Sequence, residues 1–253
     1  GINIHAKNRE VDHELTHPTM FRETEFSIVF QMIVDTYGVP NYKEANPAVF
    51  ACVTFPFLFG VMFGDIMHGG LLLAFALWVC IYGKPGGKDI ASSAYPIRHF
   101  ILLMGFFATF CGFCYNDYTS VPLYLFGPSC YVYHEGIPEA ELLPDCVYPI
   151  GVDPAWMMSS QELTFMNSLK MKMAVIFGVA QMSLGILMKG SNALQQRSSI
   201  DFLFEFLPQI IVLLCLFGYM DLMIIMKWLT NWEGREMYAP SVIGTMIDMF
   251  LNL

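Results

Sequence analysis

The feature that most constrains this chain is a series of apolar runs that are too long for the core of a water-soluble domain. Of its 253 residues, 55% are hydrophobic and only 14% are charged, and its mean hydropathy is +0.50. Soluble domains carry about 25% charged residues, whereas roughly 20 consecutive apolar residues form a helix that crosses a bilayer. We therefore expect an all-α fold, a polytopic bundle of transmembrane helices with the lipid bilayer as its solvent.

Five apolar segments are expected to span the membrane. The first apolar run, 48–82, is too long for one span, and the glycine-rich stretch Gly64–Gly70 interrupts it. We interpret this run as two short spans joined by a break. Pro208 is expected to kink the last span near its start. The predicted spans are 48–64, 66–82, 97–115, 163–188 and 202–226.

The chain divides into a polar N-terminal part, 1–47, and a transmembrane part, 48–253. Within the first part, apolar residues recur at helical spacing between Pro18 and Gly38, which predicts an amphipathic helix that is too polar to span. Such a helix lies on the membrane surface, packs on a partner, or is an ordinary surface helix. Because the chain begins at Gly1 with no apolar segment behind it, we expect no signal peptide and a start inside a longer protein.

The distribution of basic residues predicts the orientation. Lys and Arg concentrate in the connectors around 83–98 and 189–199, and cytoplasmic loops carry this excess. The loop 116–161 has no Lys or Arg, so we expect it to be lumenal. Its acidic residues are Asp117, Glu135, Glu139, Glu141, Asp145 and Asp153. Cys130 and Cys146 lie in this loop and would form a disulfide if it faces an oxidising compartment.

Several classes of function are not supported. The net charge is −9, so nucleic acid is not an expected partner. The chain has neither a GxxxxGK phosphate loop nor an HExxH zinc motif, and we expect no cofactor, no metal and no catalysis by this chain alone. Cys111 and Cys114 form a CxxC without a second pair, which favours packing over metal binding.

Four ionisable residues are candidates for a proton path or for assembly. Inserting a charged side chain within a span costs at least ~2.5 kcal/mol on insertion scales, so each charged residue there needs a structural or functional explanation. Asp65 and His68 stand three residues apart in the break, where Asp65 would cap the following helix or the two would exchange a proton. Lys170, at the start of the fourth span, would reach the interface or pair with an acidic group on another span. Asp221 lies inside the fifth span without an evident partner.

At this point an ordered series of motifs becomes recognisable, and it extends over nearly the whole chain from Pro18 onward. The two most specific blocks are FPFLFGVMFGD, at 55–65, and NSLKMKM, at 167–173. The series resembles the family of large membrane subunits, subunit a, of eukaryotic vacuolar-type proton ATPases. The other motifs are His68-Gly69, Leu102–Gly105, Tyr115–Asp117, Tyr148-Pro149, Phe217–Tyr219 and Lys227-Trp228.

The resemblance implies a stator subunit that takes part in proton translocation beside a rotating proteolipid ring and in assembly of the membrane sector. It implies a total of eight spans, with a peripheral stalk and an ATP-hydrolysing sector contacted through a cytoplasmic domain absent from this chain. The ring-facing arginines of the family have no counterpart here. An endomembrane or vacuolar location, or the plasma membrane for some isoforms, is expected. The alternative is a secondary transporter or channel of an unrelated family, which would carry inverted repeats with paired broken helices.

Overall fold

The computed structural model describes residues 19–132, 140–144, 146–230, 232 and 238–251. This part of the chain is mostly helical, with two small hairpins in the long loop. The α-helices are α1 Ile28–Asp35, α2 Ala48–Phe63, α3 Ile66–Tyr82, α4 Ile90–Ala94, α5 Arg98–Tyr115, α6 Glu162–Gln195, α7 Ser199–Asp201, α8 Leu207–Leu213, α9 Tyr219–Leu229 and α10 Val242–Leu251. The all-α expectation is confirmed.

Three helical stretches among the described residues are long and apolar enough to cross a membrane. They are Ile90–Tyr115, Glu162–Gln195 and Ser199–Leu229. The break predicted within Gly64–Gly70 is present but shorter, because only Gly64 and Asp65 separate α2 from α3, two apolar helices of 16 and 17 residues. At a rise of 1.5 Å per residue each is only about 25 Å long, slightly less than a typical hydrocarbon core of about 30 Å.

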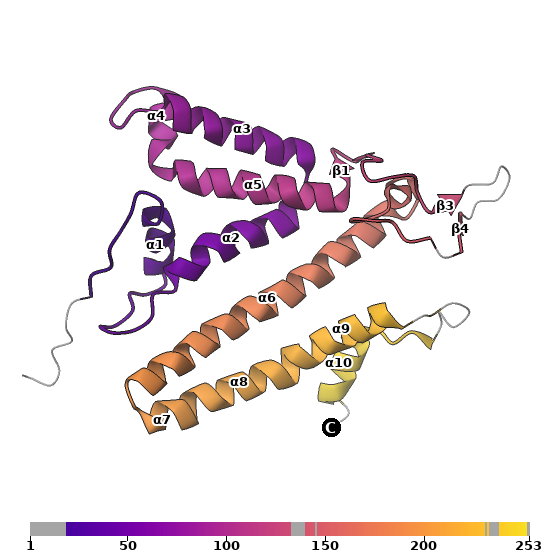
Figure 1. The fold of residues 1–253 in the computed structure, drawn as a ribbon. Coiled ribbons are helices and arrows are strands. Elements are labelled where there is room, and N and C mark those ends of the chain that lie inside the picture. Colours follow the sequence, from indigo (N-terminus) through magenta and orange to yellow (C-terminus); the bar gives the residue numbers. More distant parts are fainter. Residues whose placement is uncertain (1–18, 133–139, 145, 231, 233–237, 252–253) are drawn as a thin grey trace, which may run out of the picture.

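The helices are arranged so that their connections gather at two opposite ends (Figure 1). α5 lies side by side with α3 and packs against α2 on its other side, and α6 runs antiparallel to the α8–α9 segment. The connection between α3 and α5 and the turn at α7 lie at one end. The break between α2 and α3, the long loop and the start of α6 lie at the other end. The loop residues thus stand close to the candidate residues of the break.

Glycines allow α3 and α5 to approach until their backbones touch. A Cβ added to Gly69 would stand 2.5 Å from the backbone nitrogen of Thr109, and one added to Gly105 would stand 2.6 Å from that of Leu73. Small residues give membrane helices this kind of close packing. The neighbouring Gly70, by contrast, has no atom within 4 Å of an added Cβ.

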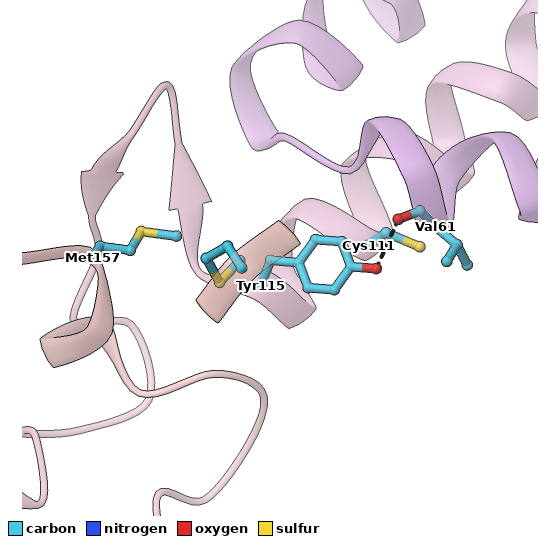
Figure 2. Packing of buried hydrophobic residues seen from close by; sticks show 5 residues of the cluster. Val61, Cys111, Tyr115 and Met157 are labelled. Atoms are coloured by element: carbon cyan, nitrogen blue, oxygen red, sulfur yellow. Dashed lines mark hydrogen bonds between the residues drawn. The ribbon is translucent and has the colours of Figure 1, made fainter. Parts of the chain in front are cut away.

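A small buried cluster joins the elements at the loop end (Figure 2). Val61 of α2, Cys111 and Tyr115 of α5, Met157 and Met166 pack together. The Tyr115 hydroxyl donates a hydrogen bond of 2.8 Å to the backbone carbonyl of Val61, which lies in the last turn of α2 and cannot complete its helical bonding. The cluster fixes α2 and α5 against the 3₁₀ helix η2, Pro154–Met158, and α6.

Several predicted boundaries differ from the structure. The N-terminal helix is confined to Ile28–Asp35, shorter than 18–38; Pro18 lies outside the described residues. α6 continues to Gln195, beyond the predicted end at 188, because its polar last turns are held by contacts: Gly190 is buried against the Phe206 ring, and Asn192 accepts from the Ala45 N–H at 3.0 Å.

The fifth segment also extends further, from Ser199 to Leu229. Its helix widens to a π-helical turn, Phe202–Phe206, directly before Leu207 and Pro208. Proline has no N–H to donate to a helical hydrogen bond. A π turn accommodates this local change in the backbone hydrogen-bond pattern. A second π turn follows at Leu214–Gly218.

The long loop contains two short antiparallel pairs and a disulfide. β1, Asp117–Tyr118, pairs with β2, Val121–Pro122, and β3, Tyr131–Val132, pairs with β4, Glu141–Leu142. The predicted disulfide between Cys130 and Cys146 is present, with Cα atoms 5.6 Å apart. Of the acidic residues predicted here, Glu135, Glu139 and Asp145 lie outside the described residues.

Candidate functional site at the break between two helices

Asp65 makes the main side-chain contacts at the break between α2 and α3. The chain is extended at this residue, and its side chain caps α3 by accepting the backbone N–H of Met67 at 2.9 Å, as the sequence predicted. The same oxygen accepts the N–H of Thr119 at 3.2 Å, and the other oxygen pairs with Nδ1 of His68. Asp65 therefore joins α3 to the turn of the β1–β2 hairpin, a contact over 54 residues that the sequence does not reveal.

The surroundings of Asp65 favour its charged form. Partial burial raises the pKa of the carboxyl, but the hydrogen bonds from His68, Met67 and Thr119 outweigh it and leave the pKa below its ordinary value. Only 15% of the Asp65 side chain is exposed, against 72% of the His68 side chain. The carboxylate is thus fixed in the structure, while the imidazole faces outward.

Lys170 comes to the same place from α6. Its ammonium lies 3.9 Å from an Asp117 carboxylate oxygen and 4.9 Å from the centre of the Tyr115 ring. An acidic partner for Lys170 is thus present, but Asp117 lies in the loop, in β1, and not on another span. The sequence marks Asp117 only as one of the acidic residues of the loop; its position two residues after Tyr115, at the end of an apolar run, was the available signal.

These residues surround an open pocket of about 530 Å³. Its polar end holds Asp65, His68, Asp117 and Lys170, and its walls are apolar side chains and glycines of α2, α3 and α5. The remaining lining residues are Phe59, Met62, Phe63, Gly64, Gly69, Leu72 and Ala108. Three of the four predicted candidates thus line one pocket.

Asp221 is the exception. It lies in the first turn of α9 and does not line this pocket. Its Oδ1 atom is buried without a hydrogen-bond partner among the residues that the structure describes. A buried carboxyl oxygen without a partner is costly, so Asp221 is a separate candidate.

The opposite end of the bundle carries a contact that sequence reasoning missed. Arg98, at the start of α5, pairs with Glu25, stacks 3.8 Å over the Tyr95 ring and donates to the Tyr95 carbonyl at 3.0 Å. The ring of Phe30 in α1 packs on Phe100 of α5, with centroids 5.4 Å apart. These contacts dock the segment containing α1 onto α5. An arginine directly after Pro96 and Ile97, at the end of a loop, was the only signal in the sequence.

In the described part of the chain, no group of three His, Cys, Asp or Glu side chains is arranged to hold a metal ion. The pocket combines paired charges with an apolar wall.

Comparison with known proteins places the chain in a family. The model of the V-type ATPase 116kDa subunit family matches residues 2–253. This chain belongs to that family. It is 43% identical to V-type proton ATPase subunit a3 of Arabidopsis thaliana, with 93% of this chain and 29% of the relative covered. It is 40% identical to the vacuolar proton translocating ATPase 100 kDa subunit of Dictyostelium discoideum, with 93% and 30% covered.

A human relative, V-type proton ATPase 116 kDa subunit a 4, is 37% identical over 95% of this chain and 32% of its own length. The chain therefore spans about a third of the length of the curated relatives it matches. Family membership and the three long apolar helices together identify a membrane protein. The resemblance read from the two motif blocks is confirmed.

Proposed function

We propose that this chain is part of the membrane-embedded stator subunit of a vacuolar-type rotary ATPase, where it takes part in proton translocation and in assembly of the membrane sector. The observation that carries the proposal is the family match over residues 2–253. The relatives are named as proton ATPase subunits. Unrelated transporters and channels, the alternative class, are not favoured by this match.

The proposed partners are a proteolipid ring and the other subunits of the membrane sector. A peripheral stalk and an ATP-hydrolysing sector would be reached through a cytoplasmic domain outside this chain. The proposed location is the endomembrane or vacuolar system. Neither nucleotide nor cofactor is assigned to these residues, whose part is structural and electrostatic.

We further propose five spans, with the short helices α2 and α3 crossing as the first two. The membrane adjusts to a short span by local thinning at modest cost. The connector 83–96 would be cytoplasmic, because it carries Lys residues, and the loop 116–161 lumenal, because it has no Lys or Arg. The described parts of these two segments lie at opposite ends of the bundle. α1 would lie at the cytoplasmic surface, held by Arg98 and Phe100 of α5.

Within this topology, Asp65 and Lys170 are proposed to support the lumenal end of the bundle. Asp65 holds the α2–α3 break and the β1–β2 hairpin together, and Lys170 fixes the start of α6 near Asp117. His68 lies beside Asp65 with most of its surface exposed. Asp221 would meet a polar group of a neighbouring helix.

Purification of the full subunit through an affinity tag tests this proposal. We expect the other membrane-sector subunits and the ATP-hydrolysing subunits to be recovered with it in fixed ratio. Recovery of the subunit without them, under mild detergent and with intact protein, would refute the assignment.

Single cysteines labelled in sealed vesicles test the topology, in a background where the free cysteines are replaced. A cysteine at Lys88 should react with an impermeant maleimide from the cytoplasmic side, and one at Val147 should react only after permeabilisation. Labelling of position 147 in sealed vesicles would make the topology wrong.

A further inference from the structure

The pocket at the helix break contains hydrogen-bond donors and acceptors that the proposed support role does not use. An ammonium group has three N–H donors. The Asp117 oxygen that faces Lys170 is 3.9 Å away, beyond the 2.7–3.2 Å of an N–H···O hydrogen bond. Within the described residues, the Lys170 ammonium has only this contact and the Tyr115 ring 4.9 Å away. Its donors are available to an acceptor in the pocket.

The carboxylates of Asp65 and Asp117 differ in how many of their oxygens accept a hydrogen bond. Both oxygens of Asp65 are engaged, by Met67, Thr119 and His68. Asp117 uses one oxygen to accept the N–H of Ser120 at 2.9 Å, and its other oxygen faces Lys170 without a hydrogen bond. The polar end of the pocket thus presents a cation and an anion side by side, each with bonding capacity left.

The rest of the pocket is apolar and open to the surroundings of the helices. Phe59, Met62 and Phe63 of α2 and Leu72 of α3 line it, and Met62 and Phe63 are 49% and 67% exposed. In the proposed topology these exposed side chains face the acyl chains of the bilayer. A ligand that suits both parts is amphiphilic, with a charged head and an apolar body.

We propose that this pocket binds the headgroup of a zwitterionic glycerophospholipid, with the phosphate on Lys170 and the cationic amine on Asp117. A pocket of about 530 Å³ falls within the range of small-ligand sites. Asp65 and Asp117 outnumber Lys170, so a lipid with net negative charge would meet more repulsion than a zwitterionic one. The proposal rests on the membrane location of these helices and does not depend on a role in proton pumping.

Photo-crosslinking in isolated membranes tests the site. Membranes containing the tagged full subunit are loaded with phosphatidylcholine that carries a diazirine near the headgroup, and labelled peptides are identified by mass spectrometry. We expect label on peptides of α2, α3 and the start of α6. Lys170→Gln should lower this labelling by about tenfold or more, since it removes the charge-assisted hydrogen bond to the phosphate. Lys172→Gln, two residues away and outside the pocket, is the matched control.

Met62→Trp gives a second variant, which fills the pocket from an exposed position and keeps every charge. It should also lower labelling, and subunit assembly on native gels confirms that both variants fold. Undiminished labelling in folded Lys170→Gln and Met62→Trp would overturn the proposal. Stronger labelling by an anionic lipid probe would overturn the choice of headgroup. Full competition by soluble glycerophosphocholine would show a soluble ligand in place of a lipid.

Discussion

The paired glycines of α3 provide the sharpest test of how this bundle is held together. Gly69 and Gly70 are adjacent on one helix, but a Cβ on Gly69 would stand 2.5 Å from Thr109 N, whereas a Cβ on Gly70 meets nothing within 4 Å. Ordinary contact begins at 3.4 Å, so Gly69→Ala must separate α3 and α5 by roughly 0.9 Å, the difference of the two distances. Backbone atoms cannot rotate away as a side-chain end can.

The expected magnitude follows from two opposing terms. Overpacking destabilises a folded protein by about 1–3 kcal/mol, whereas replacing glycine by alanine in a helix stabilises it by roughly 0.5–1 kcal/mol. We therefore expect Gly69→Ala to destabilise the bundle by about 1–2 kcal/mol and Gly70→Ala to be neutral or slightly stabilising.

Thermal unfolding of the purified, detergent-solubilised subunit, followed by intrinsic fluorescence, measures the difference. The midpoint for Gly69→Ala should fall below that of the wild type, and the midpoint for Gly70→Ala should not. Equal midpoints for the two variants would refute the claim that backbone contact at Gly69 sets the α3–α5 distance.

Three further predictions concern the ends of the bundle. Cys130→Ser removes a cross-link between residues 16 apart; it should destabilise the loop by about 3 kcal/mol, seen as faster proteolysis of permeabilised vesicles, whereas Cys215→Ser should change nothing. Asp65→Asn keeps an acceptor for Met67 and Thr119, so this variant should assemble, with modestly reduced pumping. Asp65→Ala should lower the free energy of unfolding by about 1–3 kcal/mol. Because the pKa of Asp65 is lowered, its stabilising contribution should persist above about pH 4 and vanish only as the pH falls through that lowered value; loss of wild-type assembly on native gels already near pH 6 would contradict this. Phe30→Ala should detach α1, because this ring is only 1% exposed and packs on Phe100; hydrogen exchange of 28–35 measures the loss. Glu25→Gln, by contrast, should cost only about 0–1 kcal/mol, because Glu25 is 80% exposed.

Sequence patterns predicted the local structure well where one physical rule dominates. An Asp and three glycines within an apolar run predicted a break at Gly64–Gly70. The structure has the break, but α2 ends at Phe63 and α3 already starts at Ile66. α6 was placed within one residue at its start, Glu162, but seven residues short at its end. Its polar last turn is stabilised by Phe206 and Ala45, and such tertiary contacts leave no periodic signal.

The candidate site also contains contacts that the sequence predicted and contacts that it did not. Capping of α3 by Asp65 depends on neighbours in the chain and was predictable. The bond from Thr119 to Asp65 and the position of Asp117 beside Lys170 depend on a hairpin that turns back on the bundle. Thr119 and Ser120 adopt positive φ values of 52° and 61° without being glycines, so turn chemistry gave no warning of this hairpin.

Small residues do not by themselves mark a helix contact within this chain. An added Cβ at Gly178 or Gly185 of α6 meets no atom within 4 Å among the described residues. Gly69 and Gly105 carry the same sequence signal and do lie at a backbone contact. Small residues thus mark where close packing is possible, and the fold decides where it occurs.

We propose that this chain is part of the stator of an ATP-driven proton pump. The decisive measurement is ATP-dependent acidification of vesicles, followed by quenching of a pH-sensitive dye, from cells that lack every copy of this subunit and from the same cells after its full-length form is restored. We expect acidification to be absent without the subunit and to return with it. Undiminished acidification in vesicles that lack the subunit would show that the proposed role in proton pumping is wrong.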